Sequence, residues 1–188
     1  IEPAESSEGN FLAAVVAGSQ RDTNSAAAYL REALRADPRN TELIERSFEA
    51  HLAGGNVEEA ARLARQMLTR ERNNSLARLT LAIESFRRKQ FASARESIAQ
   101  GAKGRAAEVT ATLLTAWAHQ GSGQTAKAIE IGDRLKGEQV LVVFRDYTLG
   151  LIADLAGKPD IAEKRLRTAY DTVSGASARI VEALVRFE

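Results

Sequence analysis

A series of alanines recurs along the chain at a spacing of 34 residues, without insertion or deletion: Ala26, Ala60, Ala94, Ala128 and Ala162. Each alanine lies within a stretch in which apolar residues follow helical spacing, and a short turn-like segment precedes that stretch. The clearest turns are residues 54–56 (Gly-Gly-Asn) and 121–123 (Gly-Ser-Gly). Since each turn divides two helical stretches, the pattern predicts a series of helix–turn–helix units.

The first helix of each unit is expected near residues 8–20, 41–53, 75–88, 106–120 and 140–156. The second helix is expected near 23–36, 57–71, 91–102, 125–136 and 159–173, and a further amphipathic helix over 176–188. Residues 139–144 (QVLVVF) are interpreted as the buried start of a helix, with a short strand as the alternative. Pro159 fits a first helical turn, where its missing N–H does no harm, and Ser174-Gly175 is expected to end that helix.

Small side chains recur at two positions of the unit. With the alanine series at position 20, position 8 holds Ala14, Phe48, Ala82, Ala116 and Gly150. Small residues allow two antiparallel helices to approach closely, where large ones would push them apart. Positions 8 and 20 are therefore expected at the contact between the two helices of a unit.

These residues resemble the tetratricopeptide repeat, a helix–turn–helix unit of 34 residues. Residues 7–40 and 41–74 match its motif best, above all at 29–38 and 54–60, and the later units are degenerate. The resemblance covers about residues 7–174 and is to the divergent bacterial kind of this family.

The resemblance implies an all-α fold, namely a right-handed α-solenoid of about five helix–turn–helix repeats plus a C-terminal helix. The repeats are expected at 7–40, 41–74, 75–108, 109–142 and 143–174, after an N-terminal tail at 1–6. Residues 175–188 are expected to form either a capping helix or the start of a truncated sixth repeat.

The resemblance also implies that positions 2, 5, 9 and 12 of each unit line a concave groove. From the third repeat onward these positions are mostly apolar or aromatic, which is typical of a protein interface. The candidate groove residues are Leu79, Ile83, Phe86, Leu113, Trp117, Phe144, Tyr147 and Leu151. The alternative is that neighbouring helices, or the last helix, bury them.

In the second repeat, residues 41–74, three of these four positions are acidic and the fourth is Leu52. Glu42, Glu45 and Glu49 lie at helical spacing on one face. This candidate acidic face is interpreted either as a patch that receives a basic peptide or as an ordinary solvated face.

The composition narrows the classes of function. The chain has 26 basic and 25 acidic residues, a net charge of +1, so no overall field attracts nucleic acid. It has no cysteine, which excludes disulfides and thiol chemistry, and no apolar run of about 18 residues that would span a membrane. Because it begins with Ile1 and not Met, both an exported or periplasmic and a cytoplasmic location stay open.

Candidate chemistry is sparse. The two histidines, His51 and His119, both occupy position 11 of a unit, where packing is a better interpretation than metal ligation. Residues 121–127 have a faint likeness to a phosphate loop, but their place in the repeat predicts a turn. Asn74 belongs to an Asn-Asn-Ser segment that includes a glycosylation sequon, and it is interpreted as a helix cap. No catalytic, metal or cofactor site is expected.

Two functions fit these observations. The chain is expected to be a non-catalytic scaffold that binds a peptide or helix of another protein in its concave groove. The alternative is a structural spacer or self-associating arm, with a homodimer as the simplest form.

Overall fold

Helices account for all the regular structure in the described part of the chain. The structure is a computed structural model and describes residues 6–101, 104–172, 178–185 and 187. Within these ranges no strand occurs, and residues 139–144 form the start of a helix as expected. The expected all-α helical repeat fold is confirmed. The chain divides into two units, residues 1–88 and 89–188.

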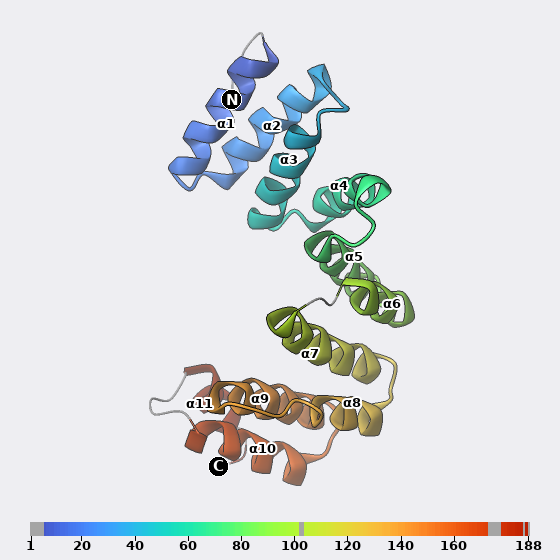
Figure 1. The fold of residues 1–188 in the computed structure, drawn as a ribbon. Coiled ribbons are helices and arrows are strands. Elements are labelled where there is room, and N and C mark those ends of the chain that lie inside the picture. Colours follow the sequence, from blue (N-terminus) through green and yellow to red (C-terminus); the bar gives the residue numbers. More distant parts are fainter. Residues whose placement is uncertain (1–5, 102–103, 173–177, 186, 188) are drawn as a thin grey trace. The chain divides into compact units, whose positions relative to one another are not determined.

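The first unit holds five helices, α1 (Ser7–Ser19), α2 (Thr23–Ala36), α3 (Thr41–Ala53), α4 (Val57–Arg70) and α5 (Ser75–Arg87), and each packs against the next (Figure 1). Each helix begins after a residue whose side chain accepts a hydrogen bond from a backbone N–H three residues on; these caps are Ser6, Asp22, Asn40, Asn56 and Asn74. Such caps satisfy donors that the helix itself leaves free. The prediction that Asn74 caps a helix is confirmed.

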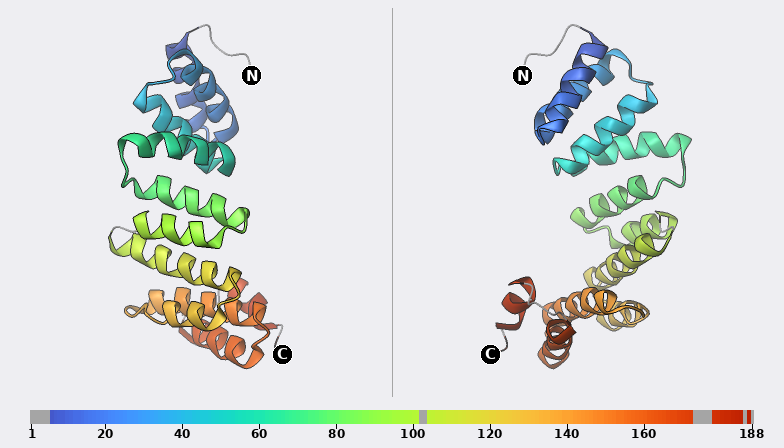
Figure 2. Two further views of the ribbon diagram at one scale, coloured as in Figure 1. Left: turned by 90° about the vertical axis from the view of Figure 1, so that its right-hand side faces the viewer. Right: turned by 60° about the vertical axis from the view of Figure 1, so that its left-hand side comes forward.

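The second unit holds α6 (Phe91–Gly101), α7 (Arg105–Gly121), α8 (Thr125–Gly132), α9 (Gln139–Leu155), α10 (Pro159–Thr172) and α11 (Ala178–Val185), seen from two further sides in Figure 2. An apolar cluster of Ala116, Ala128, Leu149 and Ile152 joins α7, α8 and α9. A second cluster, Leu166, Ala169, Ile180, Ala183 and Leu184, joins α10 and α11. The expected N-terminal tail, apart from Ser6, and the helix end at Ser174-Gly175 lie outside the described residues.

The 34-residue period is present in the backbone geometry. The second helices begin at Thr23, Val57, Phe91, Thr125 and Pro159, and the first helices end at Ser19, Ala53, Arg87, Gly121 and Leu155. The residue with positive φ in the turn between them also recurs at this spacing, as Arg21, Gly55, Lys89, Gly123 and Gly157. Residues 121–123 are therefore a turn of the repeat, as the sequence indicated.

The connections from one pair of helices to the next depart from the period. α7 and α9 have 17 residues each, whereas α1, α3 and α5 have 13, and the additional residues lie at their N-terminal ends. α8 ends at Gly132, four residues before the expected end at 136. At Gly132 a Cβ would lie 2.5 Å from Cδ2 of Leu149, so a larger residue there would require the Leu149 side chain on α9 to shift. After Gly132 the chain is no longer helical, and the Leu135 carbonyl accepts a hydrogen bond from the Arg145 side chain.

Close approach at positions 8 and 20 is visible where α9 meets α10. A Cβ at Gly150 would lie 2.7 Å from Cγ of Leu166 and 3.3 Å from the backbone oxygen of Ala162. Ala162 and the equivalent Ala60, Ala94 and Ala128 are fully buried.

None of the described helices has the combination of length and apolar character needed to cross a membrane.

Candidate partner-binding site

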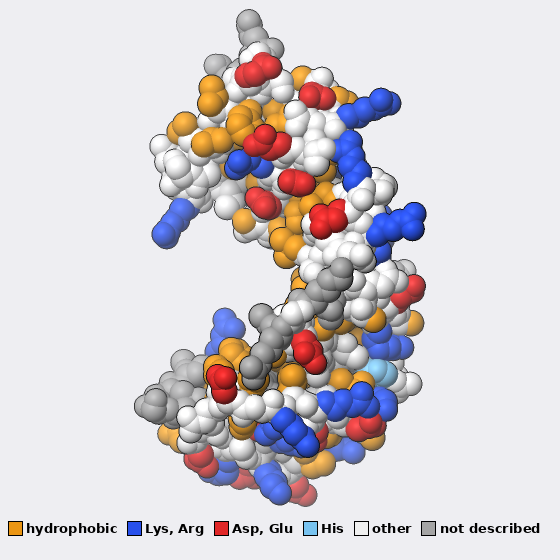
Figure 3. All heavy atoms as spheres, in the orientation of Figure 1, with side chains coloured by type: hydrophobic (Ala, Val, Ile, Leu, Met, Phe, Trp, Pro, Cys, Tyr) orange, Lys and Arg blue, Asp and Glu red, His pale blue; other side chains and the backbone are white. Residues whose placement is uncertain are grey.

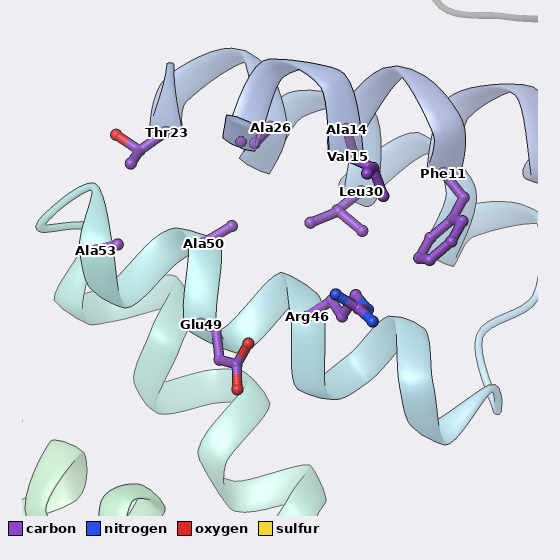
Figure 4. A pocket seen from close by; sticks show the side chains of 11 residues that line it. Phe11, Ala14, Val15, Thr23, Ala26, Leu30, Arg46, Glu49, Ala50 and Ala53 are labelled. Atoms are coloured by element: carbon purple, nitrogen blue, oxygen red, sulfur yellow. The ribbon is translucent and has the colours of Figure 1, made fainter. Parts of the chain in front are cut away.

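A hollow of about 350 Å³ lies in the first unit, between α1 and α3. α2 packs against both of these helices and supplies part of its wall. The hollow exists because most lining side chains are short; the lining residues are Phe11, Ala14, Val15, Gly18, Thr23, Ala26, Leu30, Arg46, Glu49, Ala50 and Ala53. In Figure 4, Phe11, Val15 and Leu30 face Arg46 and Ala50 across the open space.

The lining is mostly apolar; its polar side chains are Thr23 on α2 and the charged Arg46 and Glu49 on α3. There the guanidinium of Arg46 lies 5.5 Å from the centre of the Phe11 ring, a cation–π geometry. The Nε atom of Arg46 also donates a hydrogen bond of 3.2 Å to the Glu42 carboxylate. Arg46 is thereby held in place and its charge is offset.

The predicted acidic face lies beside this hollow. Glu42, Glu45 and Glu49 are all exposed on α3. Only Glu42 has a partner, since Glu45 and Glu49 form no ion pair with any other described residue. In Figure 3, acidic side chains gather over α3 with hydrophobic surface around them.

A second hollow, of about 530 Å³, adjoins the first and shares Phe11 with it. Its wall comes from the first turn of α1, the end of α2 and the start of α3. Three carboxylates line it, Glu8, Asp37 and Glu42. An apolar hollow and an acidic hollow therefore lie next to each other.

Three of the predicted groove residues lie on α5 in the first unit. Ile83 is exposed, while Leu79 and Phe86 are half-buried. Leu76, one turn before Leu79, is also exposed and extends the same apolar face.

The other five predicted groove residues lie in the second unit, and two of them pack against an apolar cluster there. Tyr147 and Leu151 pack against the cluster formed by α10 and α11. Trp117 packs against the cluster that joins α7, α8 and α9, and Leu113 is half-buried. Phe144 stays 53% exposed and is the most accessible of the eight.

Comparisons with known proteins identify the repeat. Residues 19–82 match the family model "Tetratricopeptide repeat". This segment of the chain therefore belongs to the tetratricopeptide repeat family. The sequence resemblance is thus confirmed, and the matched segment lies in the first unit, from the end of α1 into α5. Tetratricopeptide repeats are scaffolds for protein–protein interaction.

Solved structures share the fold at low sequence identity. A tetratricopeptide repeat protein from Parabacteroides merdae ATCC 43184 has a TM-score of 0.73 at 14% identity, covering 97% of this chain and 72% of its own. MamA from Desulfovibrio magneticus RS-1 has a TM-score of 0.67 at 16% identity, covering 100% of this chain and 99% of its own. YrrB, described as a TPR protein with an unusual peptide-binding site, has a TM-score of 0.63 at 14% identity, with 90% and 87% covered. The comparison with curated proteins found no match.

Two buried charges, on α5 and on α9, were not predicted from the sequence. Glu84 on α5 accepts hydrogen bonds of 2.6 and 3.2 Å from Arg65 on α4. This contact holds the pKa of Glu84 below its usual value. In the second unit, Asp146 on α9 pairs with Arg145 and with Arg165 on α10, both at 2.7 Å. A single carboxylate on an otherwise apolar helix face is the signal that could have found Asp146.

The surroundings of the two histidines, His51 and His119, are those of residues that pack within the repeat. His51 is buried, and burial lowers its pKa because the charged form loses hydration. His119 is half-buried, with Nδ1 2.6 Å from Oε1 of Gln124 at the following turn. Within the described ranges, no three His, Asp or Glu side chains lie close enough to hold a metal ion.

Proposed function

We propose that the chain is a non-catalytic scaffold that binds a peptide or helix of another protein in the hollow between α1 and α3. The observation that carries the proposal is the hollow itself, which is apolar, open and about 350 Å³ in volume. Binding sites for small groups usually measure roughly 300–1,000 Å³ and have apolar linings with a few polar groups. The size suits a few anchor side chains of a peptide.

The walls are suited to apolar anchors. Val15 is 47% exposed at the mouth of the hollow, and Phe11 is half-buried beside it. Contact with an anchor side chain removes this apolar surface from water, at about 25 cal/mol per Å². The helices around the hollow are held by side-chain caps and by a shared core that includes Leu30, Ile44 and Phe48, so little ordering is required on binding.

The likeness to YrrB supports a peptide ligand, since the described feature of that protein is a peptide-binding site. The apolar face of α5, which includes Leu79 and Ile83, offers further contact surface in the same unit. The remaining predicted groove residues, among them Phe144, stay candidates for a separate contact in the second unit.

Selection of peptide ligands from a displayed random library tests the proposal. Selected peptides are expected to bind the unmodified chain and to bind Val15→Asn at least about tenfold more weakly, because an anchor then meets a polar group. A second variant, Ala50→Phe, places a side chain of the protein itself in the hollow and is expected to have the same effect.

Leu155→Asn is the matched control, since Leu155 is 69% exposed and lies in the second unit. It is expected to leave peptide binding unchanged. If selected peptides bind Val15→Asn and Ala50→Phe as tightly as they bind the unmodified chain, the hollow is not the binding site.

A further inference from the structure

We propose that the partner segment is a basic amphipathic helix, with apolar residues on one face and Lys or Arg beside them. This inference rests on the proposed function, because it specifies the ligand of the same hollow. Its basis is the charge of the residues that line the two adjoining hollows, which are the carboxylates of Glu8, Asp37, Glu42 and Glu49 and the guanidinium of Arg46. Apolar anchors would enter the hollow lined by Phe11 and Val15, and cations would face α3 and the adjoining acidic hollow.

Two of the three acidic charges on α3 have no counterpart within the described structure. Glu45 and Glu49 are exposed and have no ion-pair partner among the described residues. Arg46 is the only cation among the residues that line either hollow, all of which lie in the described part, and Glu42 offsets its charge. A ligand that supplies cations here gains attraction without displacing an existing ion pair of Glu45 or Glu49.

Further carboxylates extend the negative surface around Phe11. Glu8 in the first turn of α1 and Asp37 after α2 line the acidic hollow together with Glu42. These groups come from three different segments of the chain, yet they meet at one place beside the apolar hollow. The two hollows together present an apolar strip with an acidic margin.

The spacing of the acids on α3 favours a helical ligand. Glu42, Glu45 and Glu49 follow a pattern of i, i+3 and i+7, so they extend along about 10 Å of the helix axis at 1.5 Å per residue. Cations at the same spacing on a partner helix share one face, beside apolar residues at the intervening turns. A helix lying alongside α3 thus brings both kinds of side chain to the surfaces that suit them.

The same charges disfavour other partners. An acidic peptide, a nucleic acid backbone or an anionic lipid surface would place negative charge against Glu45 and Glu49, which costs binding free energy. These ligands therefore serve as negative controls for the basic helix.

Calorimetric titration with three synthetic peptides of 18 residues tests the inference. The first is a Leu/Lys sequence with amphipathic helical spacing, the second replaces every Lys by Glu, and the third carries two prolines at the centre of the Leu/Lys sequence. The Leu/Lys helix is expected to bind at least about tenfold more tightly than the Leu/Glu helix at low salt, and to weaken as salt rises. The proline peptide is expected to bind at least about tenfold more weakly, because proline prevents the helix.

Variants in which Glu is replaced by neutral Gln show which carboxylates of the protein cause the preference for the Leu/Lys helix. Glu45→Gln with Glu49→Gln is expected to weaken binding of the Leu/Lys helix by about three- to tenfold, as two exposed ion pairs allow, and to reduce its salt dependence. Glu58→Gln with Glu182→Gln removes the same charge from other exposed positions and is expected to change binding less than twofold.

The possible outcomes separate this inference from the proposed function. If both helices bind equally and Val15→Asn weakens both, the hollow is a binding site but the charge preference is wrong. If the proline peptide binds as well as the Leu/Lys helix, the helical ligand is wrong. If the library selection also yields no ligand that depends on Val15, the proposed function itself fails.

Discussion

Glu84 shows how a single side chain ties two helices of the first unit together. Its side chain is 9% exposed and forms ion pairs with Arg65 at 2.6 Å and with Arg88 at 3.0 Å. Arg65 comes from α4 and Glu84 from α5, so the pair links neighbouring elements. A carboxylate that is buried and hydrogen-bonded stabilises the fold only while it is ionised.

Glu84→Gln is therefore expected to lower the free energy of unfolding by about 1.5–3 kcal/mol at pH 7, the range for hydrogen bonds to charged groups. Glu42→Gln is the control, because the exposed pair of Glu42 with Arg46 is worth about 0–1 kcal/mol. Urea denaturation measures both. Equal losses in the two variants would contradict the structural role of Glu84.

The lowered pKa of Glu84 also sets the sign of a pH dependence. Its contribution to stability is present above the pKa that Glu has in the unfolded chain, and is lost as pH falls through the lowered native pKa. The difference between the original chain and Glu84→Gln should therefore shrink as the pH is lowered into the acidic range. A difference that grows instead would reverse this assignment.

At the residue scale, the sequence predicted features that depend on local spacing. The buried alanine series, the cap at Asn74 and the burial of His51 all follow from position within the repeat. The ion pairs of Glu84 and Asp146 were not predictable in this way. Each depends on an arginine 19 residues away on a neighbouring helix, and helical spacing alone does not show which side chains of two helices meet.

Among the elements, the turn inside each helical pair is the most regular. Its positive-φ residue is glycine at three of the five positions and Arg21 or Lys89 at the other two. A residue with a Cβ is strained there, by about 1–2 kcal/mol in the left-handed region. The first unit contains both cases, since Gly55 and Arg21 occupy equivalent positions with φ of 74° and 60°.

Opposite effects are expected from substitutions at these two positions. Gly55→Ala should lower the free energy of unfolding by about 1 kcal/mol, although nothing lies within 4 Å of a Cβ built there. Arg21→Gly should raise it by up to about 1 kcal/mol, because strain is relieved at some cost in chain entropy. Thermal denaturation of both variants checks the signs, and a change in the same direction would contradict the assigned turn.

Helix starts and ends were predictable where the repeat sets them. The turns fix the ends of the first helices and the starts of the second, and these boundaries lie within one residue of expectation. The early end of α8 at Gly132 was not predicted, since the helical spacing of the sequence continues to residue 136. The close packing of Gly132 against Leu149 on α9 was not predicted either, because a local pattern does not show which side chains of another helix meet it.

For the whole molecule, the sequence and the structure point to different regions as the candidate binding surface. The sequence indicated binding mainly in the later repeats, because their groove positions are apolar. The structure shows Tyr147 and Leu151 of that set packed against the cluster formed by α10 and α11. It shows the hollows in the first unit, beside the predicted acidic face. A residue pattern shows which side chains share a face, but not whether a later helix covers them or whether short side chains leave a hollow. Self-association through the exposed apolar residues stays a prediction.

The most direct test of the account is a map of amide chemical-shift changes on titration with a selected peptide. We expect these changes to cluster on α1 and α3, around Phe11, Val15 and Ala50, and to disappear with Ala50→Phe. Changes centred on α9 and α11 instead, around Phe144 and Val185, would place the binding site in the second unit and contradict the central claim.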